Sequence, residues 1–298
     1  MLKKLFALIF IFSFSSFSHG KSIESLKESI NALLETKDAT VGVAILADDS
    51  SESISINGDK HLPMQSVFKY HLALVVLDQV DQGNLSLSDE IQISPKDLDN
   101  DLWSPIRKRY PEGASLTLAE VLKFTVANSD NVGCDILIRM LGGAEVVQTY
   151  LHSSGITDIA IKYNELNMQV VWERQYENWT TANASVLALK KFYENKEELL
   201  STESHQFLWE TMKSSTTGKD LIKANLPEGT VVAHKTGSSG KNSAGLIAAR
   251  NNIAIVFLPD SSYFYLSVLV GDSTESSTET KKIIADVAKL TWDYFKAS

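Results

Sequence analysis

The spacing of hydrophobic residues predicts helices through the middle of the chain and strands near both ends. A helix is expected over residues 21–36, because apolar side chains recur there at a helical period, at Ile23, Leu26, Ile30, Leu33 and Leu34. Strand-like runs follow at 40–47 and 53–57. A Thr117-x-x-Glu120 capping box opens one of the later helices. The helices predicted from residue 61 onward cover 66–82, 118–127, 131–141, 145–152, 183–193 and 203–213.

The C-terminal third returns to a strand pattern rich in Val, Ile and aromatic residues. It predicts strands, followed by an amphipathic helix at 275–295, and the strands are placed at 230–235, 243–250, 253–258 and 263–270. Strands at both ends with helices between them indicate one sheet assembled from the two termini. We therefore expect an α/β plus all-α fold. In it an antiparallel sheet flanked by helices (21–60 and 215–298) carries an inserted all-helical domain (61–214).

Composition narrows the class of protein without changing this picture. The chain has 298 residues, of which 44% are hydrophobic and 22% charged, and these are ordinary globular values. A disordered chain, a collagen-like repeat and a disulfide scaffold are thereby excluded. The balance of 28 Lys and Arg against 37 Asp and Glu gives a net charge of −9. This acidity, with no long basic run, argues against a nucleic-acid partner.

The first twenty residues have the layout of a secretory signal peptide. Lys3 and Lys4 form a charged start, residues 5–17 are apolar, and small residues precede Lys21. The apolar stretch is too short to span a bilayer, although an uncleaved N-terminal anchor is the alternative. We expect cleavage near Gly20 and an exported protein, periplasmic or secreted, that acts as a monomer without stable membrane association.

Several common kinds of catalytic site are missing from the sequence. Cys134 is the only cysteine, so no intrachain disulfide can form, and its apolar neighbours predict a small buried side chain. No Gly-x-Ser-x-Gly nucleophile elbow occurs. The six histidines lack the spacing of zinc ligands, so we expect no metal site.

A serine and a lysine at the start of the first long central helix are the first candidates for chemistry. Ser66 and Lys69 are three residues apart, which places the hydroxyl and the amine on one helical face. Taken alone, this Ser-x-x-Lys also fits a capped helix with a surface lysine. The same spacing occurs at Ser18–Lys21 and at Ser238–Lys241.

Two further tripeptides strengthen the case. Ser129-Asp130-Asn131 opens a predicted helix, where it would also make a good N-terminal cap. Lys235-Thr236-Gly237 ends a strand-like run, where a simple turn would serve as well. Each tripeptide alone is expected by chance in roughly a few per cent of chains of this length. All three motifs in this order, each on a suitable element, form a specific signal.

With these motifs the chain resembles the class A β-lactamases, whose signature they are. The likeness covers nearly all of the sequence after residue 20. The local sequence is similar to that of the PER/VEB-like extended-spectrum branch at residues 63–69, 80–83, 178–180 and 233–237. The resemblance implies a β-lactamase/penicillin-binding transpeptidase-like fold, a β-lactam substrate, no metal and no organic cofactor.

The resemblance also implies a role for each motif residue. Ser66 would be the nucleophile and Lys69 its base or electrostatic support, while Ser129 would protonate the leaving nitrogen. Backbone N–H groups of Ser66 and Ser238 would form the oxyanion hole. The residues expected to bind substrate are Asn131, Lys235, Thr236 and Ser238.

Glu165 matches the general base of deacylation, although a lone loop carboxylate could equally be a solvated side chain. Trp103 resembles the aromatic residue that borders the substrate cleft, or it is an ordinary half-buried tryptophan. The chain also departs from the family pattern. Gln169 stands where an asparagine usually helps to hold the hydrolytic water, and no substrate-binding arginine occurs in 217–221. Tyr163 and Asn178 replace the Arg–Asp ion pair of the loop, and Gln65 and Ser239 replace the cysteine pair of the class A carbapenemases.

Two alternatives share these motifs. A penicillin-binding D,D-peptidase would acylate without efficient deacylation. An exported β-lactam sensor domain would acylate and then signal without being an enzyme. The β-lactamase interpretation, giving resistance to penicillins and cephalosporins and extending to oxyimino-cephalosporins, is the one we carry forward.

Overall fold

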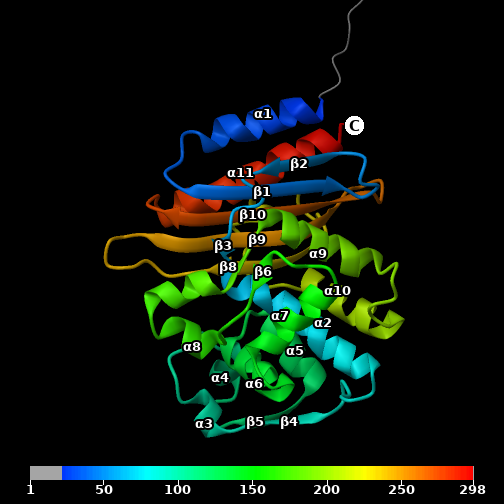
Figure 1. Ribbon diagram of the computed structural model, residues 1–298, viewed down its shortest axis with the longest axis vertical. Helices are drawn as coiled ribbons and strands as arrows, with labels where there is room; N and C mark the ends of the chain where they lie inside the picture. The colour runs from blue at the N-terminus through cyan, green and yellow to red at the C-terminus, as the bar shows by residue number, and fades with distance from the viewer. Residues whose placement is uncertain (1–21, 298) are drawn as a thin grey trace, which may run out of the picture.

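A five-stranded sheet built from both ends of the chain forms the upper half of the molecule in Figure 1. The computed structural model describes residues 22–297. The strand order is β2-β1-β10-β9-β8, and every neighbouring pair is antiparallel. The five strands are β1 Thr40–Ala47, β2 Ser53–Ile56, β8 Val232–Ser238, β9 Ile247–Phe257 and β10 Tyr263–Ser273. This confirms the antiparallel sheet assembled from the two termini.

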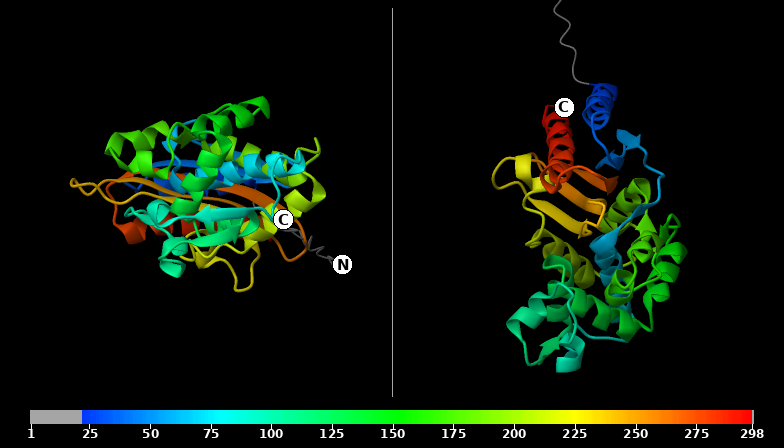
Figure 2. Two further views of the ribbon diagram at one scale, coloured as in Figure 1. Left: turned by 90° about the horizontal axis from the view of Figure 1, so that it is seen from below. Right: turned by 90° about the vertical axis from the view of Figure 1, so that its left-hand side faces the viewer.

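Both faces of the sheet are covered by helices, which is why its strands are nearly continuously apolar. One face packs against α1 (Ile23–Leu34) and α11 (Ser277–Phe295), with Ile30 and Trp292 among the buried side chains. In Figure 2 these two terminal helices lie side by side on the same side of the sheet. The other face packs against the helical part through residues such as Ile253 and Tyr265.

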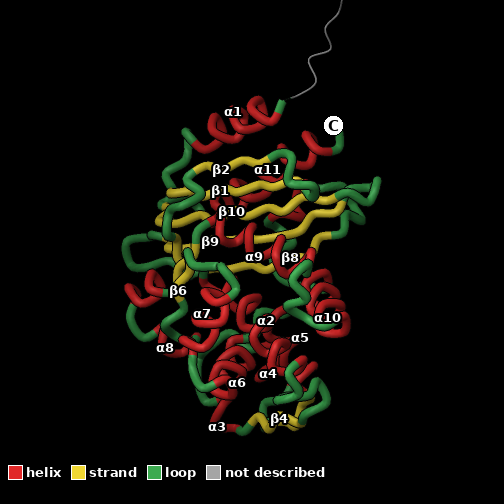
Figure 3. Tube along the Cα trace, turned by 45° about the vertical axis from the view of Figure 1, so that its right-hand side comes forward, coloured by secondary structure: helices red, strands yellow, loops and turns green. Residues whose placement is uncertain are grey.

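The helical part lies next to β8, the edge strand, and is drawn in red in the lower half of Figure 3. At its centre α2 (Phe68–Asp81) is buried along most of its length. The predicted capping box is present at the start of α5. The other helices are α3 Pro95–Leu98, α4 Pro105–Arg109, α5 Leu118–Ala127, α6 Asn131–Leu141, α7 Ala144–Ser153, α8 Glu165–Gln169, α9 Ala182–Glu194 and α10 Thr202–Lys213. Three short 3-10 helices are η1 Gln65–Val67, η2 Trp172–Glu177 and η3 Ile222–Asn225.

The segment 61–214, expected to be all-helical, also contains short strands. β4 (Glu90–Ile93) pairs with β5 (Ala114–Thr117) in a two-stranded antiparallel sheet. β3 (Leu62–Pro63), β7 (Trp179–Thr180) and β6 (Ile159–Ala160) form a small sheet where the chain leaves the main sheet. β3, β6 and β7 have two residues each, too few to show a pattern, whereas β4 alternates exposed and buried residues over its four positions. The division into two domains after residues 60 and 214 stays a prediction.

The two strands expected at 243–250 and 253–258 are in fact one strand, β9. Asn251 and Asn252 lie between the two predicted strands, and both are buried within the sheet. Asn251 donates its side-chain amide to the backbone oxygens of Pro63 (2.8 Å) and Met64 (3.2 Å). The polar residue Asn251 inside this strand therefore makes a tertiary contact with the segment before Ser66.

The predicted signal peptide, residues 1–20, lies outside the described residues. Among residues 22–297 no helix combines the length and the apolar character that crossing a bilayer requires.

Candidate active site

The candidate nucleophile lies on a tight turn that the main sheet holds in place. Ser66 is in η1, directly before α2, and the preceding Gln65 has a φ of 47°, which is a strained value for a side chain with a Cβ. Asn251 on β9 anchors this turn from the sheet. Gly237 on β8 packs so closely that an added Cβ would lie 2.2 Å from the backbone oxygen of Met64. Only glycine therefore lets β8 pass this close to the nucleophile turn.

Ser66, Lys69 and Glu165 form a three-way contact. The Lys69 Nζ lies 2.7 Å from the Ser66 Oγ and 2.6 Å from the Glu165 Oε1. The Ser66 hydroxyl donates to the same Glu165 oxygen at 3.2 Å. The sequence motif predicted the Ser66–Lys69 proximity, whereas the contact with Glu165, 96 residues beyond Lys69, comes from the fold.

The Lys69–Glu165 ion pair is buried, with the Lys69 side chain 0% and the Glu165 side chain 2% exposed. Such a pair is stable only when its remaining polar atoms also find partners. Lys69 meets this requirement, because it also donates to the Asn131 Oδ1 (2.5 Å) and to the backbone oxygen of Ser129 (3.2 Å). The first two motifs thus meet at a single ammonium group.

The third motif supplies a second buried ammonium on the other side of Ser129. Lys235 on β8 donates to the Ser129 Oγ at 2.9 Å and to the backbone oxygen of Thr236 at 3.0 Å. Burial first, and then the neighbouring Lys69, lowers the pKa of Lys235 well below its usual value. The buried Lys235 amine therefore favours the binding of an anion beside it. Ser129 itself has a φ of 57°, another strained backbone position at the site.

Asp130, the middle residue of this motif, is structural. Its carboxylate accepts hydrogen bonds from Ser104 Oγ (2.8 Å), Ile106 N (2.7 Å) and Gly133 N (2.7 Å). It thereby caps α6 and ties α4 to it. The segment just before α4 carries Trp103, whose backbone oxygen accepts from Asn131 N at 3.0 Å.

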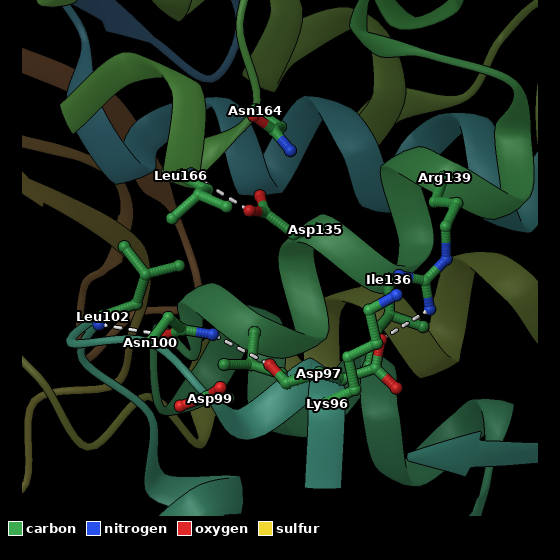
Figure 4. Close-up of a pocket in the computed structure, with 11 residues that line it drawn as sticks. Lys96, Asp97, Asp99, Asn100, Leu102, Asp135, Ile136, Arg139, Asn164 and Leu166 are labelled. Atoms are coloured by element: carbon green, nitrogen blue, oxygen red, sulfur yellow. Dashed lines mark hydrogen bonds and ion pairs between the residues drawn. The ribbon is translucent and has the colours of Figure 1, made fainter. Parts of the chain in front are cut away.

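Glu165 is the first residue of the short helix α8, and two side chains fix that helix start. The Asn164 side chain caps it by accepting from Asn167 N. Asp135 on α6 accepts from Glu165 N at 2.7 Å and from Leu166 N at 3.0 Å. Figure 4 draws the bond between Asp135 and Leu166. Gln169, at the other end of α8, lies with its Nε2 3.5 Å from the Glu165 Oε2. Sequence reasoning missed Asp135, because its partners are backbone groups that no motif shows.

The side-chain amide of Asn178 closes the Glu165 loop, at the place where the resemblance to class A enzymes implies an Arg–Asp ion pair. The Asn178 Oδ1 accepts from Lys162 N (2.8 Å) and Tyr163 N (3.0 Å), and its Nδ2 donates to Tyr163 O (2.7 Å). The backbone oxygen of Asn178 accepts from Met64 N at 3.0 Å. The loop is therefore joined directly to the strand that precedes the nucleophile turn.

Two adjoining hollows form a cleft over these groups, and they share Trp103, Asn131 and Ser238 in their walls. The first, about 280 Å³, is lined by Ser66, Ser129 and Thr236. The second, about 340 Å³, extends past Gln65 toward Gln169, Val171 and Trp172. Trp103 is 64% exposed and lines both hollows, whereas its role toward a substrate stays a prediction.

Arg250, a residue that sequence reasoning missed, also lines the first hollow. It stands opposite Ser238 in the β8–β9 register and donates to the Ser238 Oγ. Its second guanidinium nitrogen lies 3.3 Å from Ser277 Oγ. Segment 217–221 contains no arginine, and the guanidinium in this hollow comes from β9. Pairing β9 with the strand of the third motif is the step that would have found it.

The open edge of β8 directs a backbone donor toward the nucleophile turn. Ser239 N donates to Ala249 O, so alternate residues of β8 face β9. The N–H of Ser238, between two such positions, therefore points away from β9. β8 is the edge strand of the sheet, so no neighbouring strand of it pairs with that N–H, and Ser238 and Ser66 line the same hollow.

Within residues 22–297, no group of three or more His, Cys, Asp or Glu side chains is arranged to hold a metal ion. A separate cavity of about 510 Å³ lies between α3, α6 and α8, and Ser66 is not among the residues that line it. The groups that the structure brings together around Ser66 are two buried amines, two hydroxyls and one carboxylate.

Comparison with known proteins agrees with this arrangement. The sequence profile described as "Beta-lactamase enzyme family" matches residues 25–295. The chain is 41% identical to "Beta-lactamase VEB-1" of Pseudomonas aeruginosa over 295 residues, covering 99% of this chain and 98% of that protein. It is 42% identical to "Extended-spectrum beta-lactamase PER-1" of the same organism over 283 residues, covering 95% and 91%.

Solved structures give the same result. The TLA-3 extended-spectrum β-lactamase superposes with a TM-score of 0.90 at 45% identity, covering 92% of this chain and 100% of that one. The TLA-1 enzyme superposes with a TM-score of 0.89 at 45% identity, covering 92% and 99%.

Proposed function

Because the chain belongs to the class A serine β-lactamases, in their PER/VEB branch, and so hydrolyses the β-lactam amide bond, we propose that it does so through a Ser66 acyl-enzyme and a Glu165-activated water. The three-way contact of Ser66, Lys69 and Glu165 carries this proposal. Family membership decides against the D,D-peptidase and sensor alternatives.

In acylation, the Ser66 Oγ attacks the lactam carbonyl carbon, and the hydroxyl proton passes to Glu165, directly or through Lys69. Both routes are short, since Lys69 Nζ lies 2.7 Å from the hydroxyl and 2.6 Å from the carboxylate. The backbone N–H groups of Ser66 and Ser238 would stabilise the oxyanion of the tetrahedral intermediate.

When the lactam C–N bond breaks, the leaving nitrogen takes a proton from the Ser129 hydroxyl. Lys235 donates to that hydroxyl oxygen and stabilises it when it becomes an alkoxide. A proton from Lys69 then restores the hydroxyl, and Glu165 returns the Ser66 proton to Lys69 across their 2.6 Å contact, so that the carboxylate is free for deacylation.

The substrate carboxylate would bind at the end of the cleft where positive charge and hydroxyls gather. Lys235 is buried beside Thr236, and Arg250 reaches the same hollow from β9. The Thr236 Oγ1 lies 2.9 Å from the Thr217 Oγ1, so a second hydroxyl supports the one expected to touch the substrate. Arg250, which donates to the Ser238 Oγ, would supply the guanidinium that was not found in 217–221. Asn131 would hydrogen-bond the substrate's amide side chain.

In deacylation, Glu165 takes one proton from a water whose oxygen attacks the ester carbonyl. The Ser66 Oγ then leaves and recovers a proton, which regenerates the free enzyme. Gln169, within 3.5 Å of the base, would share the orientation of this water. A positioned base of this kind contributes roughly 10²–10⁴-fold to the rate.

The second hollow supports activity on bulky oxyimino-cephalosporins. It adds about 340 Å³ beyond the nucleophile and is walled in part by Gln65, which donates to the Gln175 Oε1 at 2.8 Å. The printed names of PER-1 and of the TLA enzymes describe those relatives as extended-spectrum.

Intact-mass measurement after mixing with a penicillin tests the nucleophile. The wild type should show a transient adduct and turnover, whereas Ser66→Ala should show no adduct at all. Covalent labelling of the variant at Ser129 or Ser238 would refute the assignment. Sequencing the N-terminus of the mature protein from cell fractions would test the proposed export and cleavage near Gly20.

A further inference from the structure

A segment of the Glu165 loop forms one wall of the second hollow. This wall segment, residues 170–177, contains η2 and supplies Val171, Trp172 and Gln175 to the lining. It carries exposed apolar surface, since Val171 is 45% exposed. Burying apolar surface is favourable in water, so an untethered wall segment would close over the hollow. Contacts with the rest of the protein must therefore hold the segment in place.

Two side-chain hydrogen bonds provide such contacts among residues 22–297. Gln65 donates to the Gln175 Oε1 at 2.8 Å, which joins the wall segment to the nucleophile turn. The Tyr176 hydroxyl donates to the Asp272 carboxylate on β10, which joins the segment to the main sheet. Burial, and then this bond, raise the pKa of Tyr176, so the hydroxyl keeps its proton and stays a donor.

The acceptor of the second bond, Asp272, has a strained backbone. Its φ is 47°, in the left-handed region that residues with a Cβ rarely adopt. On either side of it, Gly271 pairs with Ala249 and Ser273 pairs with Ile247 of β9. The sheet therefore fixes Asp272 from both directions, and strain maintained in this way is typical of a functional contact.

The opposite wall of the hollow belongs to the same corner of the sheet. It includes Ser239, whose N–H donates to Ala249 O at 2.9 Å. Ala249 in turn pairs with β10 at the residue directly before Asp272. The bond from Tyr176 to Asp272 therefore fixes one wall of the hollow relative to the other.

We propose that Tyr176 and Asp272 determine specificity for β-lactams with bulky side chains, because their hydrogen bond holds the wall segment away from the opposite wall and keeps the second hollow open. The inference rests on the proposed function, since it assigns the oxyimino side chain to this hollow. Neither residue lines the two hollows of the cleft, so both are positioning residues that act through the wall segment.

The catalytic end of the loop is held independently of this bond. The Asn178 side chain accepts from Lys162 N at 2.8 Å and from Tyr163 N at 3.0 Å, on the other side of Glu165. Glu165 should therefore keep its place when the Tyr176 bond is lost. A substrate with a small side chain, which fits the first hollow, should then be hydrolysed normally.

Tyr176→Phe removes the hydroxyl and keeps the ring, and Asp272→Gly removes the acceptor with a residue that suits the positive φ. Each variant should lower kcat/KM for an oxyimino-cephalosporin by about fivefold, mainly through a higher KM. For a cephalosporin with a small acyl side chain, kcat/KM should stay within about twofold. The double variant should fall no further than either single one, because both remove the same bond.

Two variants serve as controls. Tyr294→Phe removes another hydroxyl–carboxylate bond, from Tyr294 on α11 to the Glu52 Oε1 at 2.6 Å, and should leave both substrates unaffected. Asp272→Asn keeps an acceptor oxygen and tolerates the left-handed backbone, so it should retain the wild-type ratio of the two kcat/KM values.

Hydrogen–deuterium exchange followed by mass spectrometry examines the wall segment without any substrate. Backbone amides of residues 170–177 should exchange faster in Tyr176→Phe than in the wild type, and equally fast in Tyr294→Phe and the wild type. Thermal unfolding of all variants monitors the fold.

The proposal is overturned if the two cephalosporins are affected equally, if neither is affected, or if exchange of residues 170–177 is unchanged. Faster oxyimino-cephalosporin hydrolysis by Tyr176→Phe would also overturn it, since the bond would then narrow the hollow. Failure of the proposed substrate range is seen in the wild type alone, as negligible turnover of oxyimino-cephalosporins, and it removes this inference as well. Failure of the present inference alone leaves the wild type active on them and the ratio unchanged in Tyr176→Phe.

Discussion

Replacing Glu165 by glutamine separates the two halves of the proposed reaction. The Glu165 carboxylate contacts both Ser66 and Lys69, and its side chain is 2% exposed. Glutamine keeps the size and can accept a hydrogen bond, but it cannot take a proton from water. Deacylation should therefore slow by roughly 10²–10⁴-fold, which corresponds to about 3–5 kcal/mol of transition-state stabilisation.

Acylation should survive this change for a reason visible in the structure. Glutamine removes the counter-charge from Lys69, and a buried amine without a counter-charge favours its neutral form. A neutral Lys69, 2.7 Å from the Ser66 Oγ, can accept the hydroxyl proton itself. The variant should thus give a fast burst followed by a stall.

Stopped-flow absorbance with a chromogenic cephalosporin measures the burst, and intact-mass spectrometry identifies the acyl-enzyme. Gln169→Ala serves as a graded companion. Its amide lies 3.5 Å from the Glu165 carboxylate, so it should slow deacylation by only about tenfold. Steady turnover of Glu165→Gln at the wild-type rate would refute the reasoning, because another base would then have to exist.

Three further predictions follow from other parts of the site. Arg250→Ala should raise KM for cephalosporins by about tenfold with a smaller effect on kcat, since it removes one charged anchor of the substrate carboxylate. Lys282→Ala, a surface change on α11, is the control. An unchanged KM in Arg250→Ala would count against a role of Arg250 in binding the carboxylate. Oxyimino-cephalosporins should be hydrolysed within about tenfold in kcat/KM of a simple cephalosporin, and a gap of several orders of magnitude would contradict the role given to the second hollow. Burial raises the pKa of Asp135 to about 7 in the fold, so its contribution to stability is full at low pH and is lost as the pH rises through 7. Denaturant titrations should therefore show Asp135→Asn gaining stability relative to the wild type between pH 4 and 7. A constant difference in stability between the two proteins would contradict the shifted pKa.

Much of the fold can be predicted from the sequence, because many of its elements carry a local sequence signal. The capping box at Thr117 and Glu120 fixed the start of α5, and apolar periodicity located the terminal helices. β9 was misjudged because Asn251 interrupts its apolar run, and the bonds that explain this asparagine go to the turn before Ser66. A residue whose partner lies 188 positions away leaves no local trace in the sequence.

The same holds for the active site, where only residues with a local sequence signal could be predicted. The three motifs located Ser66, Ser129 and Lys235, because their spacing and element types are set locally. Arg250 and Asp135 escaped notice, because one acts across a strand pair and the other through the backbone of α8. Their contributions depend on which elements the fold brings together.

The attachment of the nucleophile turn to β8 and β9 has a consequence for the order of folding. The turn at residues 63–66 is anchored by Asn251 and packs against Gly237, so its geometry depends on chain synthesised long afterwards. Contacts of such sequence separation form late, because closing a long loop costs entropy before any contact offsets that cost. β1, near the N-terminus, likewise waits for β10 before it is paired on both sides. A chain still emerging from the ribosome or crossing a membrane would therefore carry Ser66 without a reactive site, and acylation by a β-lactam would report that the last strands have joined the sheet.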